Sequence, residues 1–325
     1  MSELRTRDDL LVIPTDKNLG PSVVQRNDYI QEVLQDHLLD ENNYQFIPKE
    51  ESEAAVHRQL QLFLTCYGTF RHTINNEAVI QYFDRALDTD RLETLQVGKF
   101  YGMPKIHKKR KTGHILPPLR PVFSLVGTNN AIFSTYLDFI LKPIMQNNLR
   151  SYIKDSDSLR EALLQTFPEG LQAGDRLFSF DAVAMYSNID SDHGIETIRH
   201  WLENMDIDTS NIPVEFVMAS LHLIMNENIF QFGDTCWKQI RGAAMGTPAA
   251  VVYANLYAGL PEEQHLLENY SRNLPFYKRF IDDTIGVWRH NPADPAAWTR
   301  FQKDLNDWVS PRCETEDVLT HKHDL

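Results

Sequence analysis

The stretch Phe276-Tyr277-Lys278-Arg279-Phe280-Ile281-Asp282-Asp283-Thr284-Ile285-Gly286-Val287-Trp288 decides how the rest of the chain is interpreted. Apolar and aromatic residues run up to two adjacent aspartates and resume beyond them. This pattern predicts two strands joined by a tight turn that carries both carboxylates. The plain interpretation is a solvated turn. The alternative is a pair held in place to bind divalent cations, since hard cations such as Mg²⁺ prefer carboxylate oxygens.

A third carboxylate at another strand end would favour the cation site, and Asp181 is a candidate for it. Asp181 directly follows the apolar strand predicted for Leu177-Phe178-Ser179-Phe180, and Tyr186 comes five residues later. The structural alternatives are a helix N-cap or surface acid for Asp181 and a core aromatic for Tyr186. Helices are predicted over residues 191–204 and 213–226, with a proline in the first turn of the second.

A glycine-bearing loop lies between the two aspartate-bearing segments. Residues 228–240 predict a hairpin with the two-residue turn Gly233-Asp234. The hairpin runs into Gly242-Ala243-Ala244-Met245-Gly246-Thr247-Pro248, and a helix is predicted from there through Leu260. Glycines ahead of a helix allow a substrate to approach the backbone closely, although many loops share this pattern.

A basic segment stands out in a chain whose formal net charge is −13. Such a local excess of positive charge attracts phosphate, although a solvated loop is the alternative. The flanking residues 101–107 and 119–124 predict a hairpin, in which Lys105 and Arg120 would bracket a polyphosphate. The segment contains no Asp or Glu, and its basic residues are Lys99, Lys105, Lys108, Lys109, Arg110, Lys111 and Arg120.

Scaffold elements are predicted on both sides of these motifs. Short strands at residues 10–13 and 22–24 flank a turn, and a helix begins at Asp28. Apolar spacing predicts helices between residues 52 and 97. A long amphipathic helix follows, capped by Thr128 and ending near Pro143. A short helix is predicted over 155–168 and a last one over 298–309.

Composition limits the class of protein. The chain has 325 residues, of which 42% are apolar, enough for a sizeable core. No apolar run approaches the ~18–20 residues that span a bilayer, and acids occupy the N-terminus where a signal peptide would need an apolar segment. Cys66, Cys236 and Cys313 form no disulfide or zinc pattern. We therefore expect an intracellular protein of the nucleus or cytoplasm without a membrane span.

In their order along the chain, these motifs resemble those of reverse transcriptases, and in detail the Penelope-like group of retroelements. The resemblance covers about residues 10–310. The chain departs from the pattern at Thr247-Pro248-Ala249-Ala250, where a serine is expected, and in a long loop between Lys105 and Arg120. The matching segments are Phe178–Asp181, Tyr186–Ile189, Gly242–Pro248, Ala254–Leu256, Phe280–Asp283, Met103–Lys108, Leu119–Val122 and Asp16–Gly20.

The resemblance implies an α+β fold with the palm and fingers of a right-hand polymerase. It assigns residues 1–98 to an N-terminal helical and fingers region, and 99–174 to fingers with the basic hairpin and the long helix. Residues 175–310 are the implied palm with the catalytic aspartates, and 311–325 an incomplete C-terminal end. The thumb is expected to be absent or incomplete, and no GIY-YIG endonuclease is visible.

The implied activity is that of an RNA-directed DNA polymerase, a nucleotidyltransferase that extends a DNA or RNA primer along an RNA template with dNTPs. Asp181, Asp282 and Asp283 would be catalytic and would hold two Mg²⁺ ions, or Mn²⁺, ~3.5–4 Å apart. Tyr186 would select deoxynucleotides by blocking a 2′-hydroxyl. Gln239 is alternatively an ordinary strand residue. The residues implied to bind the nucleotide are Lys105, Arg120, Ala182, Val183, Tyr186, Gln239 and Gly242.

Two other functions remain open from the sequence. A viral RNA-dependent RNA polymerase shares the palm and the paired aspartates, but usually has a second aspartate at the position of Tyr186 and a glycine at that of Ile281. The second function is that of a catalytically inactive or domesticated nucleic-acid-binding remnant of a retroelement. The three aspartates count against such a remnant, whereas the missing thumb and the acidic balance favour it. The oligomeric state is open.

Overall fold

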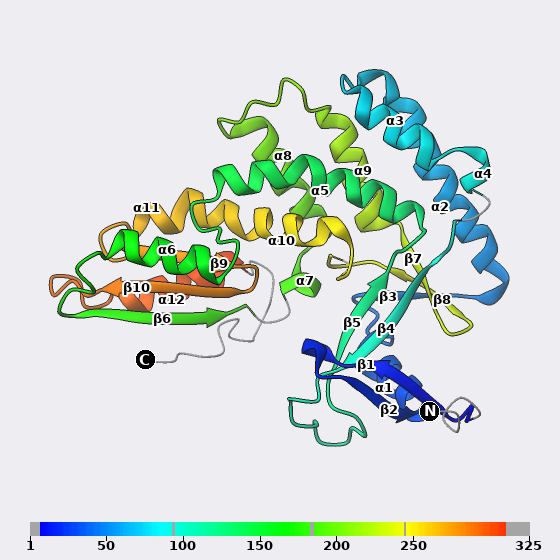
Figure 1. The fold of residues 1–325 in the computed structure, drawn as a ribbon, viewed down its shortest axis with the longest axis horizontal. Helices are drawn as coiled ribbons and strands as arrows, with labels where there is room; N and C mark the ends of the chain where they lie inside the picture. The colour runs from blue at the N-terminus through cyan, green and yellow to red at the C-terminus, as the bar shows by residue number, and fades with distance from the viewer. Residues whose placement is uncertain (1–6, 93–94, 183–184, 244, 310–325) are drawn as a thin grey trace. The chain divides into compact units, whose positions relative to one another are not determined.

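A computed structural model (Figure 1) describes residues 7–92, 95–182, 185–243 and 245–309. The chain folds into two units. Unit 1 comprises Met1–Tyr136 and Glu215–Pro248, and unit 2 comprises Leu137–Val214 and Ala249–Leu325. Both units combine helices with a β-sheet, which confirms the expected mixed class. Val183 and the C-terminal end expected over 311–325 lie outside the described residues.

Five strands form one sheet in unit 1, in the order β3-β8-β7-β4-β5. The predicted hairpins are confirmed as β7–β8, joined by Gly233-Asp234, and as β4–β5, which sets Met103 opposite Arg120. Neighbouring strands run antiparallel except β4 and β7, which run parallel. The strands are β3 (Tyr44–Ile47), β4 (Gly98–Pro104), β5 (Leu119–Ser124), β7 (Asn228–Phe232) and β8 (Thr235–Gln239).

A second, two-stranded hairpin precedes this sheet in the chain. β1 (Leu10–Pro14) and β2 (Pro21–Gln25) pair antiparallel as predicted. Helix α1 (Arg26–Val33) follows directly and continues into the π-helical turn η3 (Leu34–Leu38). Aromatic and aliphatic residues from α1, β2 and the sheet share one core, which buries Val24, Tyr29, Val33, Leu38, Tyr44, Phe100, Leu119, Phe123, Phe230, Phe232 and Trp237.

The helical pattern between residues 52 and 97 is broken by a cap. The Asn76 side chain accepts hydrogen bonds from the backbone N–H groups of Ala78 and Val79, which starts a new helix there. Stacked and edge-to-face aromatic rings then join these helices, with Phe83 contacting both Phe133 and Phe216. Besides α1 and η3, the helices described in unit 1 are α2 (Lys49–Phe70), α3 (Glu77–Ala86), α4 (Thr89–Leu92) and α9 (Val214–Asn226), with the 3₁₀ turns η2 (Asp16–Asn18) and η4 (Arg71–Thr73).

Helix α5 (Asn129–Asn148) begins as predicted but is longer than predicted. The hydroxyl of Thr128 accepts a hydrogen bond from the Ala131 N–H, which confirms the cap. The helix does not end near Pro143, so that prediction is wrong. Pro143 lies on the exposed face, where water can bind the carbonyl of Phe139 that has lost its N–H partner.

Three antiparallel strands in the order β6-β10-β9 form the sheet of unit 2. The strand–turn–strand predicted around the paired aspartates is confirmed as β9 (Phe276–Phe280) and β10 (Asp283–Arg289), and β6 (Asp175–Asp181) is the predicted aspartate strand. The helices of this unit are α6 (Ser156–Thr166), α7 (Met185–Asn188), α8 (Ser191–Asn204), α10 (Pro248–Pro261), α11 (Leu267–Asn269) and α12 (Ala297–Val309), with the π-helical turn η5 (Glu262–Leu266) between α10 and α11.

One aromatic core joins this sheet to α12. Phe178 and Phe180 on β6 pack against Phe301 on α12, and the ring centroids of Phe178 and Phe301 are 5.6 Å apart. Gly286 on β10 faces Phe178, and a Cβ added there would lie 2.3 Å from the ring atom Cζ. The close approach requires glycine at this position. None of the described helices combines the length and the apolar character needed to cross a bilayer.

Candidate active site

Asp181 and Asp283 are direct cross-strand partners. Asp181 is the last residue of β6 and Asp283 the first of β10, and the antiparallel register pairs them. Directly opposite residues point to the same face of a sheet and have Cβ atoms ~4.5–5.5 Å apart. Both side chains are exposed. The fold therefore brings two carboxylates from segments about 100 residues apart to one end of the sheet in unit 2.

Asp282 lies in the turn between β9 and β10, beside these two residues. Phe280 pairs with Asp283, so Ile281 and Asp282 form a two-residue connection. Ile281 has φ of 58°, the left-handed region that β-branched residues rarely adopt. The Asp282 carbonyl accepts a hydrogen bond of 2.9 Å from the Ala182 N–H. The turn is thus bound to the residue that follows the first aspartate.

The donor set fits a hard divalent cation. Asp282 is half-buried, while Asp181 and Asp283 are exposed. Mg²⁺ binds carboxylate oxygens but keeps several waters, and it usually takes only one or two protein carboxylates together with substrate phosphates. Carboxylates at an open strand end can share a cation with water and phosphate, whereas carboxylates enclosed in a core cannot.

The residues after Asp181 are only partly described. Ala182 is half-buried, and its N–H is bound to Asp282 as above. Val183, a predicted nucleotide contact, lies outside the described residues. Tyr186 is half-buried in the short helix α7, four residues beyond Ala182. The contact of Tyr186 with a sugar hydroxyl stays a prediction.

The basic hairpin of unit 1 brings Lys105 and Arg120 together with an acid. Nε of Arg120 lies 3.0 Å from Oδ1 of Asp16, whose side chain is only 6% exposed. Burial lowers the pKa of Lys105, and the neighbouring Arg120 charge lowers it further. The two cations therefore repel each other within one half-buried group. An anion bound between them would relieve this repulsion.

The loop between β4 and β5 is tied to α1. The carboxylate of Glu32, only 2% exposed, accepts hydrogen bonds from the Ile115 N–H at 2.6 Å and from Nδ1 of His114 at 2.7 Å. Burial alone would raise the pKa of Glu32, but these hydrogen bonds outweigh burial and lower it. Asp36 adds an ion pair with Lys111 at 3.6 Å. The exposed residues Lys108, Lys109 and Arg110 remain at the loop surface.

Gln239 is buried, and its amide is bound within the protein. Its Nε2 donates to the carbonyls of Arg241 at 2.9 Å and Gly242 at 3.0 Å, while its Oε1 accepts from Nδ2 of Asn228 at 2.8 Å. Gln239 is only 3% exposed. In this structure the side chain therefore fixes the start of the glycine loop, and a direct contact with nucleotide or template stays a prediction.

The glycine loop packs against β5. Gly242 and Gly246 have φ of 82° and 104°, which favour glycine. A Cβ at Gly246 would lie 2.5 Å from the carbonyl oxygen of Phe123. The N–H of Phe123 donates to the carbonyl of Met245 at 2.9 Å. The second glycine is thus required for packing against a strand, independently of any substrate.

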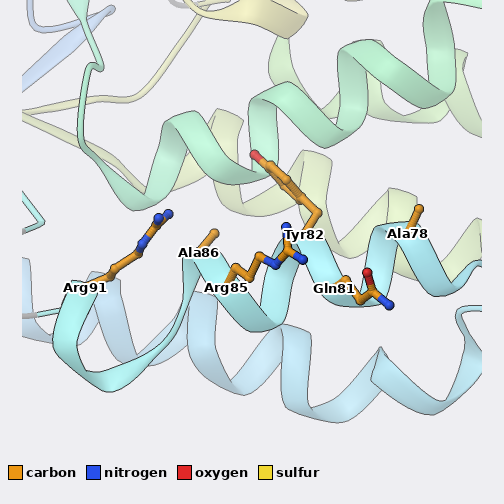
Figure 2. A pocket seen from close by; sticks show the side chains of 6 residues that line it. All are labelled: Ala78, Gln81, Tyr82, Arg85, Ala86 and Arg91. Atoms are coloured by element: carbon orange, nitrogen blue, oxygen red, sulfur yellow. The ribbon is translucent and has the colours of Figure 1, made fainter.

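A surface pocket in unit 1 contains none of the predicted site residues (Figure 2). Its volume is ≈ 440 Å³. Figure 2 shows Tyr82 reaching up from α3, and its hydroxyl donates to the carbonyl of Ile132 on α5 at 2.9 Å. The pocket is lined by Ala78, Gln81, Tyr82, Arg85, Ala86 and Arg91.

Sequence reasoning missed the charged residues beneath the aspartate turn. Arg279 is 3% exposed and forms an ion pair with Glu262, which is 2% exposed, at 2.7 Å. The local signals are a Lys-Arg pair inside an aromatic strand and an acidic pair directly after the apolar helix α10. Neither signal identifies the partner. The sequence places Asp16 in a motif but gives no sign that it is the partner of Arg120.

Comparisons with known proteins find similarity in structure alone. No protein-family model and no curated protein matches the sequence. The chain is similar to telomerase from Candida albicans in complex with the TWJ fragment of telomeric RNA, with 12% identity and a TM-score of 0.55 over 95% of this chain and 49% of that one. It is also similar to apo telomerase from Candida tropicalis, with 10% identity and a TM-score of 0.56 over 95% of this chain and 51% of that one.

A form of the Candida tropicalis apo enzyme truncated from its C-terminal domain gives 11% identity and a TM-score of 0.55, over 92% of this chain and 56% of that one. The chain therefore spans about half the length of the telomerases that it resembles. At these identities the likeness concerns the fold. The chain has a mixed α/β fold similar to that of telomerase.

Proposed function

We propose that this chain is the polymerase part of an RNA-directed DNA polymerase, which extends a primer on an RNA template with dNTPs. The observation that carries the proposal is the placement of three carboxylates: Asp181 opposite Asp283, with Asp282 in the turn between β9 and β10. Asp181 and Asp283 are exposed and Asp282 is half-buried, so metal ions and phosphates can reach this strand end.

The fold comparison supports the same class of enzyme. Telomerase belongs to the reverse transcriptase family, and one similar structure is of telomerase with a fragment of telomeric RNA. We extend RNA binding to this chain on that basis. The order of the motifs favours the Penelope-like group within reverse transcriptases, with residues 1–174 as fingers and 175–310 as palm.

In the proposed reaction, Asp181, Asp282 and Asp283 hold two Mg²⁺ ions. The ions would lower the pKa of the primer 3′-hydroxyl and neutralise charge on the triphosphate and the leaving pyrophosphate. The protein itself contributes position and electrostatics, because phosphoryl transfer needs little covalent chemistry from side chains. The paired strand ends and the bound turn keep the carboxylates in place before substrate arrives.

Lys105 and Arg120 are the proposed triphosphate ligands. They form one group of neighbouring cations whose repulsion an incoming anion would relieve. Asp16 forms an ion pair with the guanidinium of Arg120 on one side. In this proposal Gln239 acts through the shape of the glycine loop, and Gly242 presents backbone to the nucleotide. Tyr186 and its neighbours Ala182 and Val183 would lie beneath the sugar.

Primer extension tests the proposal directly. The chain is given an RNA template, a DNA primer and Mg²⁺, with either dNTPs or ribonucleotides. We expect extension with dNTPs, and loss of at least a hundredfold in rate in Asp282→Asn. Asp234→Asn is a matched control, because Asp234 occupies the two-residue turn of another hairpin, β7–β8. Its rate should equal that of the parent.

The same assay separates the alternatives. Equal use of ribonucleotides would contradict the proposed role of Tyr186 and favour an RNA polymerase. If no extension occurs, Mg²⁺-dependent dNTP binding is measured in the parent and in Asp282→Asn. Binding that disappears in the variant indicates a competent site on an incomplete polymerase. No binding in either protein would contradict the proposal and favour an inactive nucleic-acid-binding remnant.

A further inference from the structure

A buried ion pair lies beneath the turn that carries the aspartates. Arg279 is on β9, two residues before the turn, and Glu262 is in the π-helical turn after α10. Their side chains are 4% and 2% exposed. Burial alone would lower the pKa of Arg279, but the Glu262 charge and hydrogen bonds outweigh burial and raise it. The guanidinium is therefore charged at all physiological pH values.

Every N–H of the Arg279 guanidinium has an acceptor. Nε and Nη2 form a bidentate pair with the Glu262 carboxylate at 2.7 and 3.0 Å. Nη2 also donates to the Asn255 carbonyl at 3.1 Å, and Nη1 donates to Asn255 Oδ1 at 2.8 Å. The remaining Nη1 hydrogen is donated to the carbonyl of Ile281 at 3.0 Å. Four donors thus hold the rigid guanidinium against Glu262 and Asn255, and the fifth fixes the Ile281 carbonyl of the turn.

Glu262 is held as firmly as its partner. Its carboxylate accepts hydrogen bonds from the Tyr277 hydroxyl at 2.8 Å and the Ser151 hydroxyl at 2.6 Å, in addition to those from Arg279. The backbone of Arg279 is fixed as well, because its N–H donates to the Ser151 carbonyl at 2.7 Å. The guanidinium therefore has little freedom to move, and neither does the carbonyl bound to it.

Both peptide groups that flank Asp282 are consequently bound. The carbonyl of Ile281 on one side accepts from Arg279, and the carbonyl of Asp282 on the other accepts from Ala182. Directly before the first of these carbonyls, Ile281 has the unfavourable φ of 58°. Strained backbone persists only where surrounding contacts enforce it. Here the Arg279 hydrogen bond is a contact that does so.

A buried ion pair is a poor way to gain stability, since apolar residues of the same volume often stabilise as much. A buried ion pair does, however, fix the orientation of the groups that it contacts. We propose that Arg279, supported by Glu262, is a positioning residue that holds the turn so that the Asp282 carboxylate points toward the same metal ions as Asp181 and Asp283. The metal part of this inference rests on the proposed function, whereas the fixed turn does not.

The test compares variants that differ in the fork but not in net charge. Arg279→Lys keeps the positive charge beside Glu262 but cannot reproduce five donors. The double variant Arg279→Gln/Glu262→Gln removes both charges, so that no unpaired charge is buried if the lysine variant fails to fold. Arg289→Lys is the matched control: Arg289 forms a bidentate pair with Asp175 at 2.8 and 2.9 Å, at the opposite end of the β6–β10 pair.

Two quantities are measured in the full chain. Hydrogen exchange followed by mass spectrometry reports the turn, through peptides covering residues 276–289 and 175–182. Electron paramagnetic resonance titration with Mn²⁺ reports the metal site. We expect both Arg279 variants to speed exchange around 281–283 and Ala182 at least tenfold and to raise the Mn²⁺ Kd at least tenfold. Arg289→Lys should leave both within twofold of the parent at these positions.

The outcomes separate the inference from the proposed function. Exchange at the turn that stays within twofold of the parent in both Arg279 variants overturns the positioning role, whatever the metal does. Faster exchange with an unchanged Mn²⁺ Kd overturns the link to the aspartates. If Asp282→Asn leaves Mn²⁺ binding of the parent unchanged, the proposed metal site fails, and exchange alone then decides whether Arg279 holds the turn.

Discussion

Replacing Gly286 by alanine tests the strand register that sets Asp181 opposite Asp283. The same register places Gly286 opposite Phe178. An alanine Cβ would lie 2.3 Å from Cζ of that ring and 2.9 Å from the carbonyl oxygen of Phe276. Phe178 is 3% exposed and is packed against α12, so the ring has no free space to enter. The added methyl must therefore displace the core or the strand.

The expected cost follows from two opposing effects. Overpacking a core by one methyl costs about 1–3 kcal/mol. Replacing glycine restricts the unfolded chain and returns roughly 0.4–1 kcal/mol. We therefore expect Gly286→Ala to lower the free energy of unfolding by about 1–2 kcal/mol, a Tm decrease of roughly 1.5–3 °C for a chain of this length. Phe178→Leu replaces the ring by a shorter side chain, and combining it with Gly286→Ala should restore about 1 kcal/mol of the free energy of unfolding.

Urea denaturation followed by tryptophan fluorescence measures the cycle, because Trp288 and Trp298 lie in the same core as Phe178. The control pairs Gly286→Ala with Ser179→Ala. Ser179 is the neighbouring residue on β6 and points to the opposite face of the sheet. That pair should be additive within about 0.5 kcal/mol. Additivity of the Phe178 pair as well would refute the register, and with it the alignment of the aspartates.

Three other features give further predictions. Burial lowers the pKa of His37 from 6.5 to about 4, so the unfolded chain takes up a proton at higher pH than the folded chain, and about 3 kcal/mol of stability is lost as pH falls from 6.5 to 4. The urea midpoint of His37→Gln should therefore change less with pH over this range than that of the parent. An equal pH dependence in both proteins contradicts the assignment. Glu32→Gln weakens the acceptor for the Ile115 N–H, so trypsin should cut residues 108–111 about tenfold faster; an unchanged rate is the opposing result. Phe301→Ala empties a fully buried site and should cost about 3–5 kcal/mol in urea denaturation; a loss below about 1 kcal/mol would contradict the packing.

Local patterns were enough to predict the elements that carry the site. The paired aspartates sit in a hairpin that the alternation of apolar residues around them identifies, and Asp181 follows a strand with the same kind of signal. The β7–β8 hairpin was visible from its Gly233-Asp234 turn. Both hairpins join residues that are close in the sequence, so composition and spacing report them. Strand β6 pairs with β10 about 100 residues later, and only its own apolar run was visible in the sequence.

Interactions between distant segments were not predictable in this way. Strand β3 has four residues, too few to show a period, and exists because it pairs with β8 far along the chain. The arginine on β9 meets Glu262 through the tertiary fold, and no spacing rule relates them. Pro143 indicates a helix end in isolation, but its exposed position makes the lost hydrogen bond inexpensive. Such outcomes depend on burial, which only the folded chain defines.

The interrupted course of unit 1 along the chain has a consequence for biosynthesis. Its sheet needs β3 near the start and β8 roughly 190 residues later, so the strands made first wait for their partners. At ribosomal rates of 5–20 residues per second this delay is roughly 10–40 s. Strand β6 waits likewise for β10. Until residue 283 has been synthesised, a nascent chain contains Asp181 on β6 but not its partner strand β10. Such a chain exposes β-strand edges that a chaperone or another nascent chain can bind.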